Sequence, residues 1–192
     1  MEVFMNQLSA RMTIQKYLQE RQIVFFDYLN HENRCLVVNL QGFENCPANR
    51  LEASFCFYSK CVEVRVYYTQ FASNWLKNKK DDLSRIYRLL NYLNATIWLP
   101  INDGRQESIY PKSYFYTPRF ILTEDETYDL CCEALIDYDV FEMAPLATLD
   151  YFTAVIPEYL NEVSIPIFFT LLDKITVDEA IQMIEQKKSS LF

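Results

Sequence analysis

The sequence predicts an α+β fold: an antiparallel sheet packed by a long central helix, with extra helices at the C-terminal end. Four segments before Trp75 alternate hydrophobic and polar side chains, a pattern typical of strands that are buried on one face. The short connections between these segments favour antiparallel pairing. Residues 73–94 then form an amphipathic segment long enough to cover one face of the sheet.

The first third of the chain predicts one helix followed by the four strands. We expect a helix over residues 3–20, with Met5, Leu8, Met12 and Tyr17 toward the core. The expected strands are residues 23–29, 35–40, 51–58 and 61–69. In the last of these strands hydrophobic side chains occupy every second position, which indicates one buried and one exposed face.

The long helix is predicted from a continuous hydrophobic stripe. The stripe consists of Leu83, Ile86, Tyr87, Leu90, Leu93 and Ile97. Asn94 suits the residue that ends a helix. Asn91 lies one turn earlier, so the two side-chain amides share a face. Two interpretations stay open: Asn94 caps the helix while Asn91 faces solvent, or the pair binds the backbone at the edge of a partner.

The second half of the chain predicts two strands and three helices. Residues 96–101 and 112–122 have the composition of strands. A capping box at residues 123–126 predicts a helix that continues to about residue 136. After a connection over residues 137–143, we expect a helix over residues 146–163 with a kink at Pro157. A second capping box at residues 176–179 predicts a terminal helix.

These elements predict an α+β domain over residues 1–136, with residues 137–192 as a helical extension packed on the same domain. A chain of 192 residues with 51% hydrophobic residues can build one sizeable core. No apolar run approaches the roughly 18 residues that a membrane helix needs. The first residues lack the basic and apolar regions of a signal peptide, so we expect a cytoplasmic protein.

The cysteines are expected to be reduced and structural. There are six of them, and thiols of cytoplasmic proteins are normally kept reduced. Four residues separate Cys56 from Cys61, a spacing that occurs in zinc sites, but no second pair of ligands completes such a site. We therefore expect no metal and no cofactor.

The composition also argues against most catalytic sites. With two glycines, the chain has no phosphate-binding loop, dinucleotide fingerprint or nucleophile elbow. His31 is the single histidine, and it forms the best available dyad with Cys35. Because His31 lies in a predicted polar turn, we expect a surface histidine and a protein that is not an enzyme. A small enzyme that uses cysteine or carboxylate chemistry is the alternative.

Charge is segregated along the chain. The net charge of −8 argues against nucleic acid and anionic membranes as partners. Residues 120–173 contain twelve acidic residues and no Lys or Arg. The candidate basic counterparts are Lys77, Lys79, Lys80, Arg85 and Arg88. Either these side chains pair with the acidic segment inside one subunit, or they remain free for a partner or a second copy.

Aromatic side chains supply further candidate contacts. Most of the 14 Tyr and 14 Phe residues belong to the predicted core. Tyr67, Tyr114 and Tyr116 are the ones we expect at the surface, where tyrosine favours binding. Together with the five basic residues, Asn91 and Asn94, they form the predicted partner-binding set.

Residues 89–101, LLNYLNATIWLPI, resemble the YbjN-like family of bacterial sensory-transduction regulators. The order of elements over residues 8–136 is similar to the fold of type III secretion chaperones, and the sequence departs from the family pattern from Asp137 onward. The resemblance implies a small acidic cytoplasmic protein that binds other proteins, often as a homodimer, with no catalytic residues. We therefore expect a non-catalytic protein-binding module of chaperone or regulator type. A structural subunit of a larger assembly is a further alternative.

Overall fold

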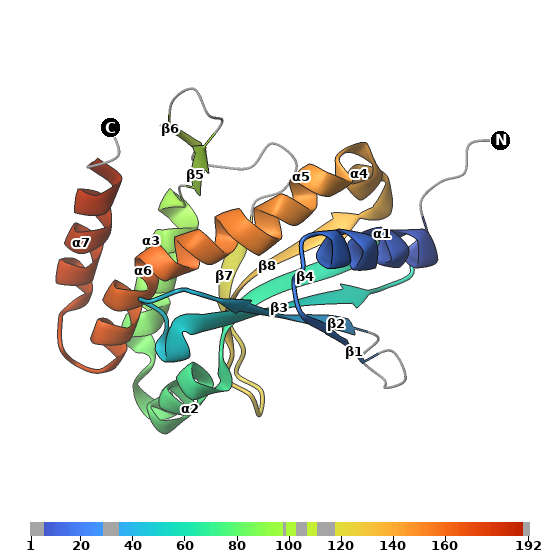
Figure 1. Ribbon diagram of the computed structural model, residues 1–192. Helices are drawn as coiled ribbons and strands as arrows, with labels where there is room; N and C mark the ends of the chain where they lie inside the picture. Colours follow the sequence, from blue (N-terminus) through green and yellow to red (C-terminus); the bar gives the residue numbers. More distant parts are fainter. Residues whose placement is uncertain (1–5, 29–34, 98, 103–106, 111–117, 190–192) are drawn as a thin grey trace.

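The computed structural model describes residues 6–28, 35–97, 99–102, 107–110 and 118–189. Within these residues, six antiparallel strands form one sheet in the order β1-β2-β3-β4-β8-β7 (Figure 1). The strands are β1 Phe25–Asp27, β2 Cys35–Gln41, β3 Arg50–Phe57, β4 Cys61–Tyr68, β7 Arg119–Leu122 and β8 Leu130–Asp137. The prediction of an α+β fold built on an antiparallel sheet is confirmed.

The strands β2, β3 and β4 follow directly from the period of two in their sequences. No end of these three strands differs from its predicted position by more than one residue. In β3, buried and partly exposed side chains alternate through the whole strand. The register places Phe55 opposite Leu36 on one side and Val64 on the other, and all three are buried. Each such side chain contributes about 1.5–3 kcal/mol when it leaves water, so this face fixes the register.

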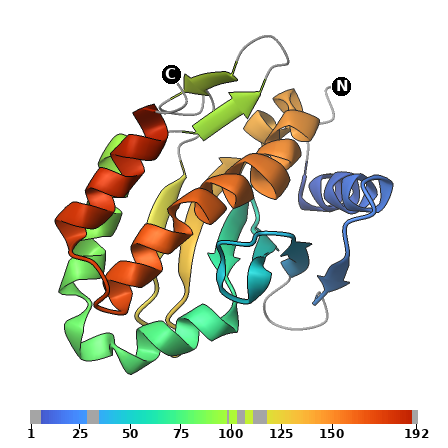
Figure 2. The same ribbon diagram turned by 60° about the vertical axis from the view of Figure 1, so that its left-hand side comes forward.

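The buried face of the sheet is covered by helices. Figures 1 and 2 show one layer, drawn in blue and orange, over this face. The layer consists of α1 Gln7–Glu20, α4 Tyr138–Met143, α5 Pro145–Asp150 and α6 Ile156–Leu171. Most side chains of α6 are buried, so α6 is the central packing helix. Between β1 and β8, no described helix lies over the opposite face (Figures 1 and 2).

Three further helices and one hairpin complete the described structure. Helix α2 Gln70–Asn78 follows β4, and α3 Ser84–Thr96 and α7 Val177–Ser189 lie side by side near the β7 edge (Figure 1). The strands β5 Leu99–Asn102 and β6 Glu107–Tyr110 pair only with each other. Among the described residues, no helix is long and apolar enough to cross a membrane.

The prediction of one continuous helix over residues 73–94 is wrong. The chain forms α2 and α3 with a short 3-10 turn, Lys80–Asp82, between them. Lys77 and Lys80 carry like charges at a spacing that would place them side by side, and Asp81 and Asp82 are weak helix formers. The stripe itself is correct, because Ile86, Leu90 and Leu93 are buried, together with Leu83 and Ile97.

The predicted helix over residues 123–136 is also wrong. Its second half is β8, which pairs with both β4 and β7. The supposed capping box is the turn of a hairpin, in which the backbone N–H of Thr123 donates to the Asp129 carbonyl. In β8, Leu130, Cys132 and Ile136 alternate toward the core, a period of two that outweighs the capping signal.

The hydrophobic side of the first helix was assigned to the wrong positions. In α1, Leu8 and Met12 are exposed, at 63% and 61% of their surface. Ala10, Ile14 and Leu18 face the core instead, with Tyr17. This stripe of aliphatic residues has the same spacing of four as Leu8 and Met12, so the hydrophobic pattern alone allowed both choices. Met5 lies outside the described residues.

The C-terminal helices exceed the prediction in length. Helix α5 continues through a π-helical turn, Tyr151–Val155, into α6, which ends at Leu171. The π turn directly precedes Pro157, which has no N–H to donate into a regular helix. The second capping box is confirmed: the Glu179 carboxylate accepts the Thr176 N–H at 2.7 Å, and the Glu179 N–H donates to the Thr176 hydroxyl at 3.2 Å.

A candidate binding groove on the open face of the sheet

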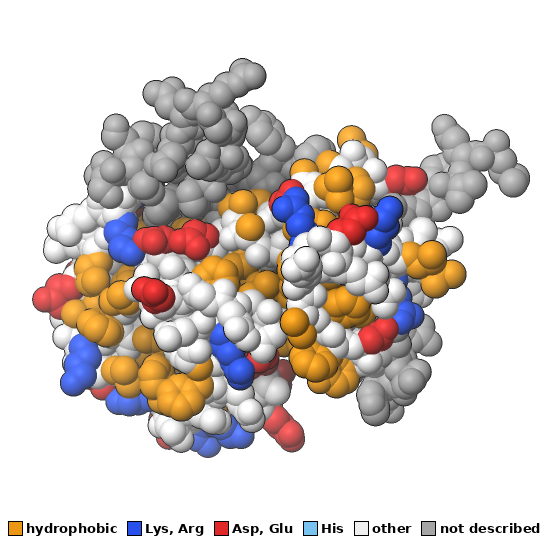
Figure 3. All heavy atoms as spheres, viewed as in Figure 1, with side chains coloured by type: hydrophobic (Ala, Val, Ile, Leu, Met, Phe, Trp, Pro, Cys, Tyr) orange, Lys and Arg blue, Asp and Glu red, His pale blue; other side chains and the backbone are white. Residues whose placement is uncertain are grey.

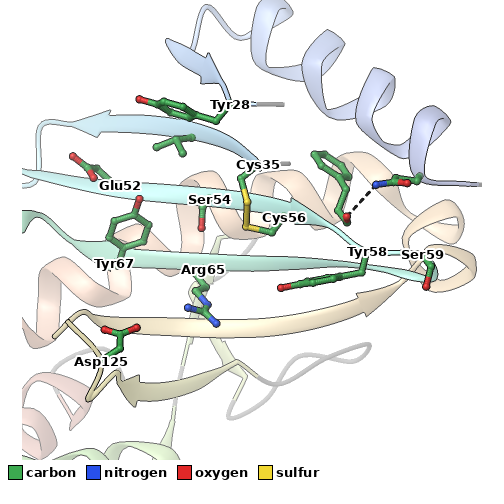
Figure 4. Close-up of a pocket in the computed structure, with 13 residues that line it drawn as sticks. Tyr28, Cys35, Glu52, Ser54, Cys56, Tyr58, Ser59, Arg65, Tyr67 and Asp125 are labelled. Carbon is green, nitrogen blue, oxygen red and sulfur yellow. Dashed lines mark hydrogen bonds between the residues drawn. A yellow bond between two sulfur atoms is a disulfide. The ribbon is translucent and has the colours of Figure 1, made fainter. Parts of the chain in front are cut away.

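A groove of about 1270 Å³ lies on the uncovered face of the sheet. Its floor is formed by β2, β3 and β4, and its rim by Tyr28, Tyr58, Ser59 and Asp125 (Figure 4). The same alternation that sends one set of side chains into the core sends the other set into this groove. The alternation in the sequence therefore predicts the floor. Ser54 and its register partner Arg65 both lie at outward-facing positions of the pattern.

The register arranges the floor in rows that cross the strands. One row runs from Cys35 through Cys56 and Glu63 to Leu135. The next row runs from Val37 through Ser54 and Arg65 to Glu133. Each row places an apolar or sulfur-containing side chain near β2 and a charged side chain near β4 or β8. The floor is therefore amphipathic from one side to the other.

Cys35 and Cys56 form a disulfide on the floor of the groove (Figure 4). The two residues are direct partners in the register of β2 and β3, with their Cα atoms 4.2 Å apart. This pairing contradicts the expectation that all six thiols are reduced. The remaining cysteines, Cys46, Cys61, Cys131 and Cys132, are free. The pairing could not be read from cysteine spacing, because it depends on the register of the two strands.

Arg65 is held in place by two carboxylates on neighbouring positions. Its guanidinium forms ion pairs with Glu63 and, at 3.5 Å, with Glu133. The Glu63 side chain is buried, and the Tyr58 hydroxyl donates to it at 2.7 Å. A buried carboxylate needs such partners, because removing an ion from water costs several kcal/mol. The charge of Arg65 is therefore balanced within the groove.

Two tyrosines of the groove remain protonated at neutral pH. The hydrogen bond to Glu63 raises the pKa of Tyr58, and burial adds to the effect. Burial raises the pKa of Tyr67, and the nearby Glu52 carboxylate raises it further. Tyr67 is partly buried and lines the groove, whereas the two other predicted surface tyrosines, Tyr114 and Tyr116, lie outside the described residues.

One end of the groove is acidic. Glu52 and Asp125 line it, and Glu52 is shared with an adjoining hollow of about 330 Å³ that is also lined by Glu126 and Asp129. The Thr127 hydroxyl and N–H both donate to Asp125, which lowers the pKa of its carboxyl to about 2. The Asp125 carboxyl therefore stays ionised at neutral pH, and the gathering of four acidic side chains gives this end a negative potential.

The predicted basic residues lie away from the groove. Lys79 and Arg85 both form ion pairs with Asp173, and Arg88 pairs with Asp178 at 2.6 Å. These three basic side chains therefore pair with acidic residues of the same subunit, which was one of the two alternatives. Asp173 belongs to the acidic segment, residues 120–173, and Asp178 lies just beyond it. Figure 1 shows why they meet, since α3 lies beside α7 and near the end of α6.

Lys77 and Lys80, the other two basic residues of the predicted set, differ from each other. The Lys77 ammonium donates to the backbone carbonyl of Glu126 at 3.2 Å and lines the hollow next to the groove. Lys80 is exposed in the 3-10 turn that separates α2 from α3. The basic set is therefore spread over separate positions and does not form one surface.

The two asparagines of the predicted set have separate roles. The Asn94 side chain binds the backbone of Phe120 in β7, accepting its N–H and donating to its carbonyl. Asn91, one turn earlier in α3, is exposed. The expected cap at Asn94 is wrong, because α3 continues to Thr96. Backbone binding by both amides was expected at the edge of a partner, whereas Asn94 alone binds a strand edge of its own chain.

Exposed hydrophobic side chains also lie outside the groove. Figure 3 shows hydrophobic side chains at the surface over α2 and the adjoining end of α6. They include Phe71 and Phe169, each about half exposed. The Phe71 ring packs edge-to-face on Trp75 with centroids 5.1 Å apart, and Trp75 packs on the buried Phe168 at 5.7 Å. This region is an outward continuation of the core.

The described residues offer little for catalysis. No group of three or more His, Cys, Asp or Glu side chains among them could hold a metal ion. Burial raises the pKa of Cys131 to about 12, so this thiol is not a nucleophile at neutral pH. His31 lies outside the described residues, so the predicted dyad with Cys35 is not described, and the Cys35 sulfur is in the disulfide.

None of the family models, curated proteins or solved structures compared with the chain matches it. The resemblance to YbjN-like regulators and to type III secretion chaperones therefore stays a prediction. The functional argument depends on the geometry of the groove.

Proposed function

We propose that the chain is a non-catalytic protein-binding module of chaperone or regulator type that acts in the cytoplasm. The groove on the open face of the sheet is its binding surface. The observation that carries the proposal is the asymmetry of the sheet, in which one face is filled by α1 and α4–α6 while the other is hollowed and uncovered by described helices. An exposed groove of this kind favours binding over catalysis.

The side chains of the groove support a protein as the bound partner. Tyr28 and Tyr58 are each about half exposed on its rim. Tyrosine offers a large rigid apolar surface with one polar end, and it is enriched at protein interfaces for that reason. On the same face of β8, Leu135 exposes 60% of its surface beside this region. Tyrosines with accessible apolar neighbours suit a polypeptide better than a small polar substrate.

The polar groups of the groove are better suited to recognition than to bond breaking. Arg65, Glu63 and Tyr58 satisfy one another, so none is positioned as an activated nucleophile or base. The groove is also open along the sheet and does not exclude water from a reacting centre. These features favour the binding module over the alternative of a cysteine or carboxylate enzyme.

Site-specific photo-crosslinking in cells tests the proposal. A benzophenone amino acid replaces Tyr58 on the rim of the groove, and in a matched control it replaces Lys16, which is exposed on α1. We expect protein adducts from the Tyr58 position and none of the same mass from the Lys16 position. An adduct at twice the chain mass would identify a homodimer. Absence of adducts at Tyr58, or identical adducts at both positions, would contradict a binding role for this face.

A further inference from the structure

We infer that the groove binds an extended basic peptide segment, with a Lys or Arg side chain between Glu52 and Asp125 and apolar side chains over Val37 and the Cys35–Cys56 disulfide. This inference rests on the proposed function, because it names the chemistry of the partner for the same surface. It depends on the length of the groove, on its uncompensated charge and on its apolar part.

The groove has the dimensions of a short extended peptide. Its floor follows β3 from Glu52 to Phe57. At about 3.3 Å per residue, this stretch spans roughly 20 Å, the length of about six residues in an extended strand. Across the strands, it reaches from Tyr28 next to β1 to Arg65 on β4. An extended peptide segment of this length can therefore lie along the floor, parallel to β3.

The acidic side chains of the groove are only partly neutralised by its basic side chains, so the groove is negatively charged. Arg65 is the basic residue of its lining, and Glu63 and Glu133 already engage its guanidinium. Glu52 lies 3.7 Å from Arg50, whose side chain is 44% exposed, so solvent screens this pair in part. Asp125 is bound by Thr127, whose hydroxyl and N–H satisfy the carboxylate without neutralising it.

The adjoining hollow adds to the same potential. The Ser73 hydroxyl donates to Asp129 at 2.6 Å and leaves its charge in place. Lys77 directs its ammonium to the backbone carbonyl of Glu126. Two basic side chains, Lys77 and Arg50, therefore lie near four carboxylates at this end, those of Glu52, Asp125, Glu126 and Asp129. A cationic side chain of a partner is the complementary group.

The opposite side of the groove is apolar and aromatic. The disulfide lies on the floor and Tyr28 stands at the rim (Figure 4), and Val37 of β2 also lines the groove. Alternate side chains of an extended peptide point the same way, so a segment with apolar residues at every second position can place them here. The intervening residues would face solvent and the acidic end.

The test uses labelled hexapeptides and the full chain. The probe alternates Lys and Val, and two comparison peptides replace Lys by Gln or by Glu. Fluorescence anisotropy measures affinity for the wild type, for Glu52→Gln/Asp125→Asn, and for Glu20→Gln/Glu158→Gln. The last variant removes the same charge from exposed acids away from the groove. Thermal melting checks that all variants fold.

We expect the Lys peptide to bind most tightly and the groove variant to lose at least about threefold in affinity at low salt. The control variant should stay within about twofold, and the groove effect should shrink at about 0.5 M salt, where the Debye length is only a few ångströms. Equal binding of the Lys and Glu peptides would overturn the inference. Equal losses in the two variants would also overturn it, since they would show nonspecific attraction to an acidic protein.

Crosslinking separates failure of this inference from failure of the proposed function. If Tyr58 captures a partner and the groove variant leaves the yield unchanged, the module binds protein but not through a basic segment. If the peptides bind as expected and no partner is captured, the groove has the stated chemistry and the protein-binding role is contradicted in the cell tested.

Discussion

The side-chain amide of Asn94 in α3 pairs with the backbone of Phe120 in β7, accepting its N–H at 2.7 Å and donating to its carbonyl at 3.0 Å. β7 is the last strand of the sheet, and an unpaired edge invites association with another strand. Asn94 imitates the next strand at one position, because an amide carries one donor and one acceptor in the spacing of a peptide group.

Replacing Asn94 by Ala should lower the free energy of unfolding by about 1–3 kcal/mol, since two partly buried backbone groups lose their partner. Asn94→Asp keeps the acceptor and loses the donor, so it should fall between Ala and the wild type. Asn91→Ala is the matched control on the exposed side of the same helix and should stay within about 0.5 kcal/mol. Urea unfolding of the three variants measures the differences. Equal effects at Asn91 and Asn94 would contradict this role.

Lys187 compensates for a gap that Pro166 leaves in α6. Pro166 lies inside the helix and has no N–H for the Glu162 carbonyl one turn earlier. The Lys187 ammonium from α7 donates to that carbonyl at 3.3 Å and also pairs with the Glu162 carboxylate. The contact therefore joins α7 to the central helix at its weakest point.

A double-mutant cycle tests this compensation. Lys187→Met should lower stability by about 1–2 kcal/mol, whereas Lys188→Met, one residue away, should change it by less than about 0.5 kcal/mol. In a Pro166→Ala background the helix regains its own donor, so Lys187→Met should cost less. Additive effects of Lys187→Met and Pro166→Ala, measured by chemical unfolding, would show that the two residues act independently.

The parts of the fold that were predictable are those in which one periodic signal was unopposed. Strands β2, β3 and β4 have a period of two and short connections, and both were visible in the sequence. β8 has the same period, but it follows a Thr-Glu-Asp-Glu sequence that also suits a helix start. Only pairing with β4 on one side and β7 on the other settles it as a strand. That tertiary contact is not encoded in a local pattern.

The candidate site was less predictable than the fold. Alternation alone places Glu52 and Arg65 on the open face, so its composition was available from the sequence. The disulfide depends on Cys35 lying opposite Cys56, and that requires the exact register of two strands separated by a loop. The groove exists because the described helices pack on the other face of the sheet. The pattern of a strand does not tell which of its faces the helices cover.

Alkaline pH should destabilise the protein through groups that are buried in their neutral form. Burial raises the pKa of the Cys46 thiol to about 12, and that of Tyr138 to about 12. In the unfolded chain these groups ionise near their ordinary pKa values of 9.0 and 10.0. Because the folded-state values are higher, their stabilisation is complete below the unfolded pKa and is lost as pH rises toward about 12.

The melting temperature should therefore fall progressively above about pH 9, and the fall should be shallower in Cys46→Ala. The variant removes one buried thiol, but burial also raises the pKa of Cys131 and of Cys132, so the onset should stay near pH 9 while the slope decreases. Scanning calorimetry between about pH 8 and pH 11 measures both curves. A melting temperature that is flat to pH 11, or unaltered in shape by Cys46→Ala, would contradict this assignment.

Reduction of the Cys35–Cys56 disulfide should lower stability, in contrast to the behaviour of a protein with six structural thiols. The bond closes a loop with a sequence separation of 21. In the chain-entropy account, such a loop contributes roughly 3 kcal/mol by restricting the unfolded chain. The expected loss in melting temperature is about 6–12 °C for a domain of this size.

Two measurements check the predicted effect of the disulfide: the number of reactive thiols and the melting temperature, each with and without reductant. Under denaturing conditions without reductant four thiols should react, in agreement with the four free cysteines, and all six should react after reduction. Cys35→Ala/Cys56→Ala should melt like the reduced wild type and should not respond to reductant. The β2–β3 pairing spans seven positions, so reduction should leave the sheet folded and the bond able to re-form. Six reactive thiols before reduction, with an unchanged melting temperature, would restore the expectation of reduced cysteines.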